Sequence, residues 1–394
     1  MGQGVVGQPD QPTCCGGGTN ILPMFSDGAV CGCAGAGETQ RSIPDLGQRV
    51  VTGSVATPAG RLPRISSQLE WRDHWGAIKA RWGVGRMDYA IDPGLYALAA
   101  PDEESPVLVS ANYKMSFDKL RSALPGRNLW ILVLDTKGIN VWCAAGKGTF
   151  GTEELAGRIE SSGLREIVSH RSLILPQLGA PGVAAHTVKK LSGFGVRYGP
   201  IEAGDLPAYL DAGCRATEAM RLKGFTLKER AVLIPVELVE AMKPSLIIAP
   251  ILFLLAGIGG PDGFWANAAV HGSFAVIAFF SAVVAGTILN PLLLPYLPGR
   301  AFSTKGLWLG AAVALIILLA SQRYDLSMWA GRLASLAWLL IIPAVTAYLA
   351  MNFTGCSTYT SPSGVNREMR WALPLEIVMA LSGLVIWTVS RIIA

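Results

Sequence analysis

A cysteine set between a tryptophan and a run of small residues is the strongest chemical feature of the sequence. Trp142-Cys143 is followed by Ala144-Ala145-Gly146-Lys147-Gly148-Thr149. Small side chains let a large flat molecule approach the backbone closely, and a thiolate is both a nucleophile and a ligand for soft metals. The residues alone leave two interpretations open, a metal-binding or reactive thiol and a buried free cysteine under a glycine-rich turn.

This segment follows the clearest buried strand of the sequence. Asn128–Asp135 is a continuous apolar run closed by an acidic residue. Cys143 would then lie near the start of a helix, where the helix dipole and nearby Lys147 favour its thiolate. Gly146-Lys147-Gly148-Thr149 lacks the glycine spacing of a phosphate-binding loop, so nucleotide phosphate is not the expected ligand.

The neighbouring segments alternate between strand and helix patterns. Apolar runs predict strands over Val107–Ser110, Glu166–Ser169 and Leu173–Pro176, and helical spacing predicts helices over Phe117–Ala123 and over Glu153–Ser161, the latter with Thr152 as N-cap. Such alternation is typical of a layered α/β domain of the Rossmann or flavodoxin-like kind. Ligands in these folds sit beyond the carboxyl ends of the strands, so the segment after Asp135 is the candidate site.

Charge is scarce and unevenly distributed along the chain. Lys, Arg, Asp and Glu make up 15% of the 394 residues, against about 25% in ordinary soluble proteins. Only 12 of these residues lie after residue 240, which indicates a soluble half followed by a membrane half. The soluble half is nearly neutral, which argues against nucleic acid as a partner.

Five apolar runs approach the roughly 20 residues needed to cross a bilayer. They cover Ser245–Gly259, Trp265–Leu289, Gly306–Ala320, Met328–Met351 and Ala372–Ile393. The first is short, which leaves a re-entrant or interfacial helix as its alternative. The distribution of Lys and Arg over the short loops predicts a multi-pass protein of the inner membrane, with the N-terminal half in the cytoplasm and the C-terminus outside. His271 and Glu376 lie near the ends of their runs, so transport is weakly supported.

The composition also suggests where the parts of the chain begin and end. We expect a flexible Gly/Cys-rich tail over 1–60, an α/β domain over 61–215, a linker over 216–243 and an all-α membrane domain of five helices over 244–394. The cysteines of the tail do not have the spacing of ordinary zinc sites, and their role stays open: Cys14, Cys15, Cys31 and Cys33.

One contiguous motif carries a family resemblance. Asn140-Val141-Trp142-Cys143-Ala144-Ala145-Gly146-Lys147 resembles the cap-helix signature of the membrane corrinoid protein of mercury methylation, the A component of that two-protein system. Leu175–Val183 and Tyr198–Pro200 resemble the corrinoid-binding part of the related iron–sulfur corrinoid protein of the acetyl-CoA pathway. The five-span tail also resembles the mercury family and is absent from the soluble relative, so the resemblance covers roughly residues 65–394.

The resemblance implies a corrinoid-dependent methyltransferase. A cobalt corrinoid of the cobalamin type would dock on the α/β domain with Cys143 as lower axial ligand to cobalt. Its methyl group would pass from methyl–cobalt(III), as a carbanion equivalent, to Hg(II) and form methylmercury. The surface against the cofactor would comprise Asn140, Val141, Trp142, Cys143, Ala144, Ala145, Gly146, Lys147, Gly148 and Thr149.

The resemblance also implies partners. The cysteines lack iron–sulfur spacing, so a ferredoxin-like 4Fe–4S protein, the B component, would supply electrons, and a methyl-tetrahydrofolate pathway component would supply methyl groups. Cys356 lies in the hydroxyl-rich connector 352–370. Two interpretations stay open for it: Cys356 contacts Hg(II), or the connector is a solvated loop. Two alternatives remain, a membrane-anchored corrinoid methyl carrier of one-carbon metabolism with another acceptor and a membrane binding or transport protein.

Overall fold

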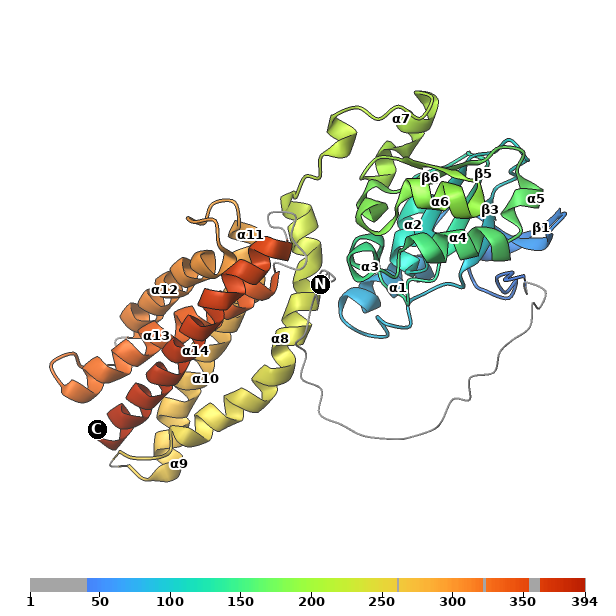
Figure 1. Ribbon diagram of the computed structural model, residues 1–394. Coiled ribbons are helices and arrows are strands. Elements are labelled where there is room, and N and C mark those ends of the chain that lie inside the picture. The colour runs from blue at the N-terminus through green and yellow to red at the C-terminus, as the bar shows by residue number, and fades with distance from the viewer. Residues whose placement is uncertain (1–40, 261, 322–323, 354–361, 394) are drawn as a thin grey trace, which may run out of the picture. The chain divides into compact units, whose positions relative to one another are not determined.

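The computed structural model describes residues 41–260, 262–321, 324–353 and 362–393. These residues form an α/β part and a helical part (Figure 1). Cys14, Cys15, Cys31, Cys33 and Cys356 lie outside the described residues.

The α/β part is built on a mixed sheet of seven strands in the order β1-β2-β3-β5-β4-β6-β7. The last four strands in sequence, β4 to β7, are mutually parallel, while β3 pairs antiparallel with β5 and β1 pairs antiparallel with β2. The strands are β1 Val51–Thr57, β2 Gly60–Ile65, β3 Gly94–Leu98, β4 Val107–Ala111, β5 Leu129–Leu134, β6 Ser172–Leu175 and β7 Gly195–Tyr198.

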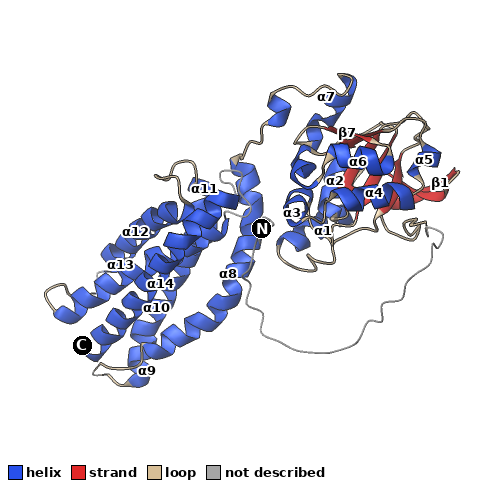
Figure 2. Ribbon diagram, in the orientation of Figure 1, coloured by secondary structure: helices blue, strands red, loops and turns tan. Residues whose placement is uncertain are grey.

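Helices cover both faces of this sheet (Figure 2). One hydrophobic core lies between the sheet and α3, α4, α5 and α6, and the other lies between the sheet and α2 and α7. The helices are α1 Trp71–Arg81, α2 Lys114–Ser122, α3 Val141–Lys147, α4 Thr152–Ser161, α5 Leu164–Ile167, α6 Ala185–Ser192 and α7 Leu206–Asp211, with short 3₁₀ turns η1 Gln177–Gly182, η2 Ala203–Asp205 and η3 Ala219–Arg221.

The order of the parallel strands is the doubly wound order of flavodoxin-like folds. The first parallel strand, β4, has the second, β5, on one side and the third, β6, on the other. The connection from β4 to β5 and the later connection from β5 to β6 therefore run in opposite directions along the sheet. The crevice between β4 and β6 is the topological switch point where such folds place their ligands. The expected layered α/β architecture is confirmed, and a Rossmann-like fold fits it.

The strand interiors explain why the sequence signal was clear. Every residue of β4 and β5 is buried, because central parallel strands are covered on both faces and so appear as continuous apolar runs. The predicted strands over 107–110, 128–135 and 173–176 correspond to β4, β5 and β6.

Three expectations for this part need correction. The segment 166–169 was expected to be a strand, but Leu164–Ile167 forms α5 after Gly163, which has a positive φ, and both ends of this turn are buried in one core. The predicted tail over 1–60 includes strand β1, whose hairpin with β2 spans the expected domain boundary at residue 61. Thr152 is the first residue of α4 rather than its N-cap, which is Gly151.

The helical part contains five helices or helix runs long and apolar enough to cross a membrane. They are α8 Leu227–Leu255; α9 Phe264–Asn267, η4 Ala268–Gly272, α10 Ser273–Val284, η5 Ala285–Leu289 and α11 Asn290–Leu293 in succession; α12 Phe302–Ser321; α13 Trp329–Asn352; and α14 Pro362–Ile392. Among the described residues, the number of candidate helices thus equals the expected number of spans.

Two helices extend beyond the predicted spans. α8 begins inside the expected linker, at Leu227, and is long enough to cross a bilayer rather than to lie as the short re-entrant helix. α14 begins ten residues before the predicted run, so Glu376 lies near its middle and is 4% exposed. Glu368 of the same helix is also buried and accepts a hydrogen bond from the Ser303 amide. The scarcity of intramembrane charge is therefore a weaker argument against transport than the sequence suggested.

Candidate functional site

The three segments singled out from the sequence meet at the carboxyl edge of the parallel strands. α3 follows β5, the Leu175–Val183 segment follows β6, and Tyr198–Pro200 ends β7. α3 packs against η1, the Tyr198 hydroxyl donates to the Val183 carbonyl at 2.6 Å, and the Gly199 amide donates to the Leu175 carbonyl at 2.8 Å. Segments up to 60 residues apart thus form one surface.

Asn112, at the end of β4, fixes the loop that leads into α3. Its side chain is 6% exposed, and its Oδ1 accepts hydrogen bonds from the Thr136 amide at 3.1 Å and the Gly138 amide at 3.0 Å. The Thr136 hydroxyl also lies 2.8 Å from the same oxygen. Sequence reasoning missed Asn112, although its place directly after a buried strand was an available signal.

Asn140 begins α3 as its N-cap. Its Oδ1 accepts a hydrogen bond at 2.9 Å from the amide of Cys143, the third residue of the helix. This satisfies one of the amides that every helix start leaves without an intrahelical partner. The predicted position of Cys143 near a helix start is confirmed, and the side chain of Asn140 orients the backbone that carries the thiol.

The two sides of α3 have different roles. Ala144 and Ala145 are buried in the core, while Trp142 and Gly146 are exposed and Cys143 is partly exposed. Cys143 and Gly146 are three residues apart and therefore share one side of the helix. A Cβ on Gly146 would meet nothing within 4 Å, so the backbone beside the thiol is open to a flat ligand.

This arrangement corrects one detail of the sequence analysis. The alanines were expected on the surface that a ligand approaches, but both face the core. Gly148 has φ +81° and ends α3 in the left-handed region, and a Cβ on Gly151 would lie 2.6 Å from the Gly148 carbonyl oxygen. These two glycines form the turn into α4, so Gly146 is the glycine that opens the outward side.

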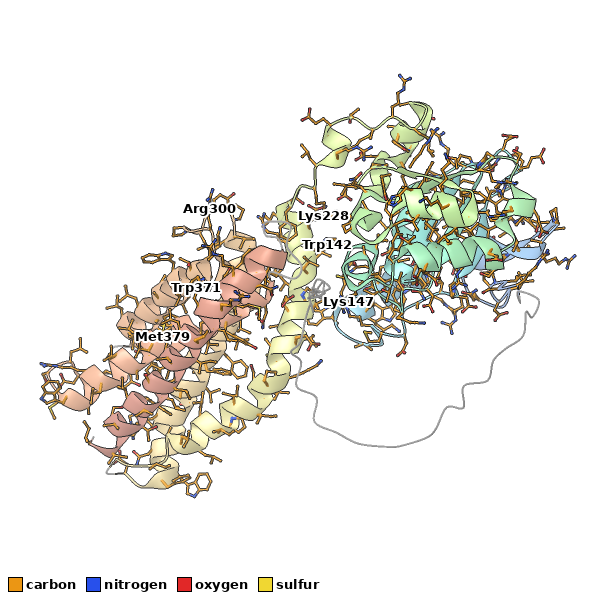
Figure 3. All side chains as sticks on the ribbon, in the orientation of Figure 1. Trp142, Lys147, Lys228, Arg300, Trp371 and Met379 are labelled. Atoms are coloured by element: carbon orange, nitrogen blue, oxygen red, sulfur yellow. The ribbon has the colours of Figure 1, made fainter. Side chains whose placement is uncertain are left out.

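The remaining residues of the motif lie around this side. Val141 is partly buried against the core, and Lys147 and Trp142 lie at the surface of the α/β part, where Figure 3 labels the latter two. Thr149 is partly buried, and its hydroxyl contacts the Ala144 carbonyl at 3.4 Å. Thr149 thus contacts one of the backbone carbonyls in the last turn of α3.

η1 fits closely beneath α3. A Cβ on Gly182 would lie 2.1 Å from the Phe150 carbonyl oxygen and 3.0 Å from the Ala145 Cα. A Cβ on Gly179 would lie 2.5 Å from the Phe150 ring. Only glycine allows this approach, and this explains why the Leu175–Val183 segment carries small residues at these places.

A cavity of about 410 Å³ opens at the switch point beside the start of α3. Its walls are mainly apolar, with a few polar groups at the rim. The lining residues of the α/β part come from the ends of β4, β6 and β7, from α2 and from α3, and include Leu108, Val109, Ser110, Ser116, Lys119, Leu120, Asn140, Val141, Trp142, Ile174, Leu175, Pro176, Leu178, Gly199, Pro200, Ile201, Glu202, Ala203 and Leu206.

An ion pair at the cavity rim was not anticipated from the sequence. The Lys119 ammonium lies 3.1 Å from the Glu202 carboxylate, and Lys223 also pairs with Glu202. Burial alone would raise the pKa of Glu202, but the hydrogen bonds from Lys223 and Lys119 hold it below its usual value. The carboxylate is therefore ionised at neutral pH, and no strand or motif signal in the sequence marks it.

Two cysteines lie in the part of the chain that the structure describes. Among residues 41–260, 262–321, 324–353 and 362–393, Cys143 and Cys214 are free thiols, and no group of three or more His, Cys, Asp or Glu side chains could hold a metal ion. Cys143 is the one of the two that lies in the motif at the carboxyl edge of the sheet.

The fold and this edge define the class of protein: a doubly wound α/β domain with a ligand crevice at its switch point, followed by apolar helices long enough to cross a membrane. Residues 85–210 match the family described as the CO dehydrogenase/acetyl-CoA synthase delta subunit. The match covers β3 to β7, α2 to α6 and all but the last residue of α7. It therefore includes α3, η1 and the cavity walls from the α/β sheet, but not Lys223.

Several curated proteins are similar over the same region. The gamma subunit of the acetyl-CoA decarbonylase/synthase complex of Methanopyrus kandleri is 32% identical over 128 residues, which cover 32% of this chain and 27% of the relative. The corresponding subunit of Methanocaldococcus jannaschii is 37% identical over 97 residues, 24% of this chain and 20% of the relative. The gamma 2 subunit of Methanosarcina thermophila is 33% identical over 130 residues, 32% and 27% of the two chains.

The chain thus matches about a quarter of the length of these relatives. The similarity relates the α/β part to subunits of the acetyl-CoA pathway complexes, the pathway that the Leu175–Val183 and Tyr198–Pro200 segments indicated. It does not indicate mercury methylation.

Proposed function

We propose that the α/β part binds a cobalt corrinoid over the outward side of α3, with Cys143 as lower ligand to cobalt, and that the chain transfers a methyl group to Hg(II), forming methylmercury. The observation that carries the proposal is the joint placement of Cys143 and Gly146 on one side of α3, beside the switch-point cavity.

The residues present fit such a cofactor in size and character. The cavity of about 410 Å³ is within the range of about 300–1,000 Å³ typical of small-molecule sites. It is too small for a whole corrin ring but suits the nucleotide tail of a corrinoid. The ring itself would lie over Gly146, where no Cβ projects, and Trp142 would border it.

A bound corrinoid would supply a cobalt centre that accepts a methyl group and releases it to an acceptor. The chain's own contribution is the thiolate of Cys143, a charged electron donor that suits a soft metal. Asn140 holds the amide of Cys143, and Asn112 holds the loop before α3. These two side chains therefore position the thiol relative to the cavity.

The remaining parts of the proposal concern substrates and place. Hg(II) is the methyl acceptor, and Cys356 is a proposed soft-metal contact for it. A ferredoxin-like 4Fe–4S protein supplies electrons, and a methyl-tetrahydrofolate pathway component supplies methyl groups. The five apolar helices anchor the chain in the inner membrane with the α/β part on the cytoplasmic side.

A second candidate is favoured by the comparisons. The relatives that match the site are subunits of acetyl-CoA decarbonylase/synthase. A membrane-anchored methyl carrier of one-carbon metabolism would use the same cofactor and the same Cys143, but a different acceptor.

The first experiment separates cofactor binding from its absence. The purified full chain is reconstituted with a corrinoid without oxygen, and the visible absorption spectra of the native protein and of Cys143→Ala are compared. A corrinoid spectrum that changes on substitution supports thiolate ligation. Folded protein that retains no corrinoid would refute both candidates.

The second experiment separates the two acceptors. Membranes containing the chain, the iron–sulfur partner and a methyl donor are incubated with Hg(II), and methylmercury is measured. Methylmercury that depends on Cys143 supports the leading proposal. A chain that binds corrinoid with Cys143 ligation but forms no methylmercury supports the methyl carrier instead.

A further inference from the structure

Helix α1 carries an exposed aromatic stripe that the proposed methyl transfer does not use. Trp71, Trp75, Ile78 and Trp82 follow one another at helical spacing and are 73%, 50%, 39% and 48% exposed. The rings of Trp71 and Trp75 stack with their centroids 6.5 Å apart. Large apolar side chains gathered on one side of a surface helix mark a binding surface rather than chance exposure.

The opposite side of α1 is fixed to the α/β part. Ala80 is buried, and the Asp73 carboxylate bridges Lys114 at 2.5 Å and Arg121 at 2.6 Å. A Cβ on Gly76 would lie 2.7 Å from the Tyr89 ring. These contacts determine which side of α1 faces outward, so the aromatic stripe is presented by a rigid base.

Basic residues border the stripe on both sides. With 100° per residue, Arg72 and Lys79 lie along one border, and His74 and Arg81 along the other. No ion pair joins Arg72, Lys79 or Arg81 to a carboxylate of the described residues. The acid of the helix, Asp73, is itself engaged by Lys114 and Arg121. The outward surface is therefore aromatic and positively charged.

This pattern matches the chemistry of a membrane surface. Tryptophan rings are amphipathic and favour the headgroup layer, and a helix with an aromatic stripe and basic borders lies in the plane of that layer. Each Lys or Arg near an anionic leaflet adds attraction to its lipids. A protein partner would have to offer acidic groups on both sides of an apolar groove, whereas an anionic bilayer offers both properties everywhere.

The chain itself keeps the α/β part close to a bilayer. Met220 still packs against one core of the α/β part, and α8, the first helix able to span a membrane, begins at Leu227. The few residues between them reach at most about 25 Å when extended. Such a short tether gives the surface of α1 a high effective concentration of lipid headgroups.

We infer that the outward side of α1, formed by Trp71, Trp75, Ile78 and Trp82 with their basic borders, docks in the plane of an anionic lipid surface. This docking holds the α/β part at a fixed height and orientation on the surface of the membrane that the helical part crosses. It rests on the crossing of a membrane by α8 to α14 and not on the identity of the methyl acceptor.

The test uses the full chain in nanodiscs made from phosphatidylcholine, with or without phosphatidylglycerol that carries a photoreactive headgroup. After irradiation, lipid adducts are mapped by mass spectrometry. One variant combines Trp71→Gln, Trp75→Gln and Trp82→Gln, and another combines Arg72→Glu, Lys79→Glu and Arg81→Glu. The matched control is Leu191→Gln, because Leu191 is a 58% exposed apolar residue on α6.

Adducts are expected on the peptide that contains α1 and not on the peptide that contains α6. Both α1 variants should lower them at least about five-fold, while the control leaves them unchanged. Hydrogen exchange of β4 and β5 checks that each variant is folded. This exchange should match that of the native chain, because substitutions of exposed side chains change stability little.

Three results would overturn the inference. Equal adducts on the α1 and α6 peptides would show that lipid contact is not specific. Adducts on the α1 peptide that stay at the native level in both α1 variants would show that neither the aromatic rings nor the basic borders hold the helix on lipid. Recovery of the chain outside the nanodiscs would refute the membrane crossing, and with it this inference, while leaving corrinoid binding to the spectroscopic test.

Discussion

At the scale of single residues, the position of the thiol depends on one side chain. Asn140 Oδ1 accepts from the Cys143 amide at 2.9 Å. Replacing Asn140 by Ala removes this cap, which is worth about 1 kcal/mol, and frees the start of a helix only seven residues long. Asn140→Ala should therefore speed alkylation of Cys143, measured on its peptide by mass spectrometry.

The conservative replacement provides the control for this prediction. Asn140→Asp keeps an oxygen that can accept from the Cys143 amide, so the alkylation rate should return toward that of the native chain. Equal rates for Asn140→Ala and the native chain would show that the cap does not position the thiol.

Two glycines give a sharper test of where the cofactor lies. A Cβ on Gly182 would meet backbone at 2.1 Å, whereas a Cβ on Gly146 would meet nothing. Gly182→Ala should cost about 1–3 kcal/mol of stability through overpacking. Gly146→Ala should leave the fold intact or stabilise α3 by up to about 1 kcal/mol, yet weaken corrinoid binding because its methyl group faces the proposed ring.

Corrinoid titration followed by absorbance, together with thermal unfolding of the same samples, separates the two effects. Unchanged corrinoid affinity in folded Gly146→Ala would place the ring elsewhere than over α3.

At the scale of elements, a buried network of charges joins α1 to α2. Lys114 and Arg121 of α2 each pair with Asp73 and with Asp118, and Arg121 is 3% exposed. Arg121 also donates to the carbonyls of Ser66 and Gln68. Removing one partner of such a network leaves charge buried without compensation, which typically costs about 3–5 kcal/mol.

The same network predicts sensitivity to acid. Burial would raise the pKa of Asp73, but hydrogen bonds and charges from Lys114, Glu70 and Arg121 lower it below its usual value. A carboxylate with a lowered pKa contributes stability above its unfolded pKa, near 4, and loses it as the pH falls through the folded value. Asp73→Asn should therefore be less stable at neutral pH and show a smaller further loss on acidification.

Hydrogen exchange of β4 and β5 in the full chain at neutral and acidic pH measures this difference. The control is Asp211→Asn, because Asp211 forms an exposed pair with Arg127 and should leave neutral-pH stability nearly unchanged. An identical acid response in Asp73→Asn and the native chain would contradict the assignment.

The elements also show what sequence patterns can predict. β4, β5 and β6 were predictable because buried strands are continuous apolar runs. α5 was not predictable, because a four-residue segment with two apolar side chains fits a strand or a helical turn equally well. β1 was missed because an edge strand alternates between partly buried and exposed residues and carries a weak signal.

The site was predictable to a similar degree. The motif located α3 and Cys143, but the inward direction of Ala144 and Ala145 depends on packing against η1, which the chain reaches only 30 residues later. Asn112 and Glu202 belong to the site through tertiary contacts alone. Local sequence indicates which residues carry chemistry, but not which distant side chains hold them in place.

At the scale of the whole molecule, the five candidate spans and the charges of the loops predict a topology that can be tested. Seven described basic residues fall on the side predicted to be cytoplasmic: Lys228, Arg230, Lys243, Arg300, Lys305, Arg367 and Arg370. Arg332 and Arg391 fall on the other side. Figure 3 labels two of the first group, Lys228 and Arg300. The excess of positive charge on the first side predicts that the α/β part lies inside.

Accessibility to a membrane-impermeant reagent should therefore alternate between successive loops. An epitope inserted after Gly299, between α11 and α12, should be protected in intact cells, and one inserted after Ser327, before α13, should be labelled. With five spans, the C-terminus should be labelled as well. The reverse pattern would put the α/β part outside, away from reduced ferredoxin and methyl-folate, so the same measurement decides whether the proposed methyl donor and electron donor can reach Cys143.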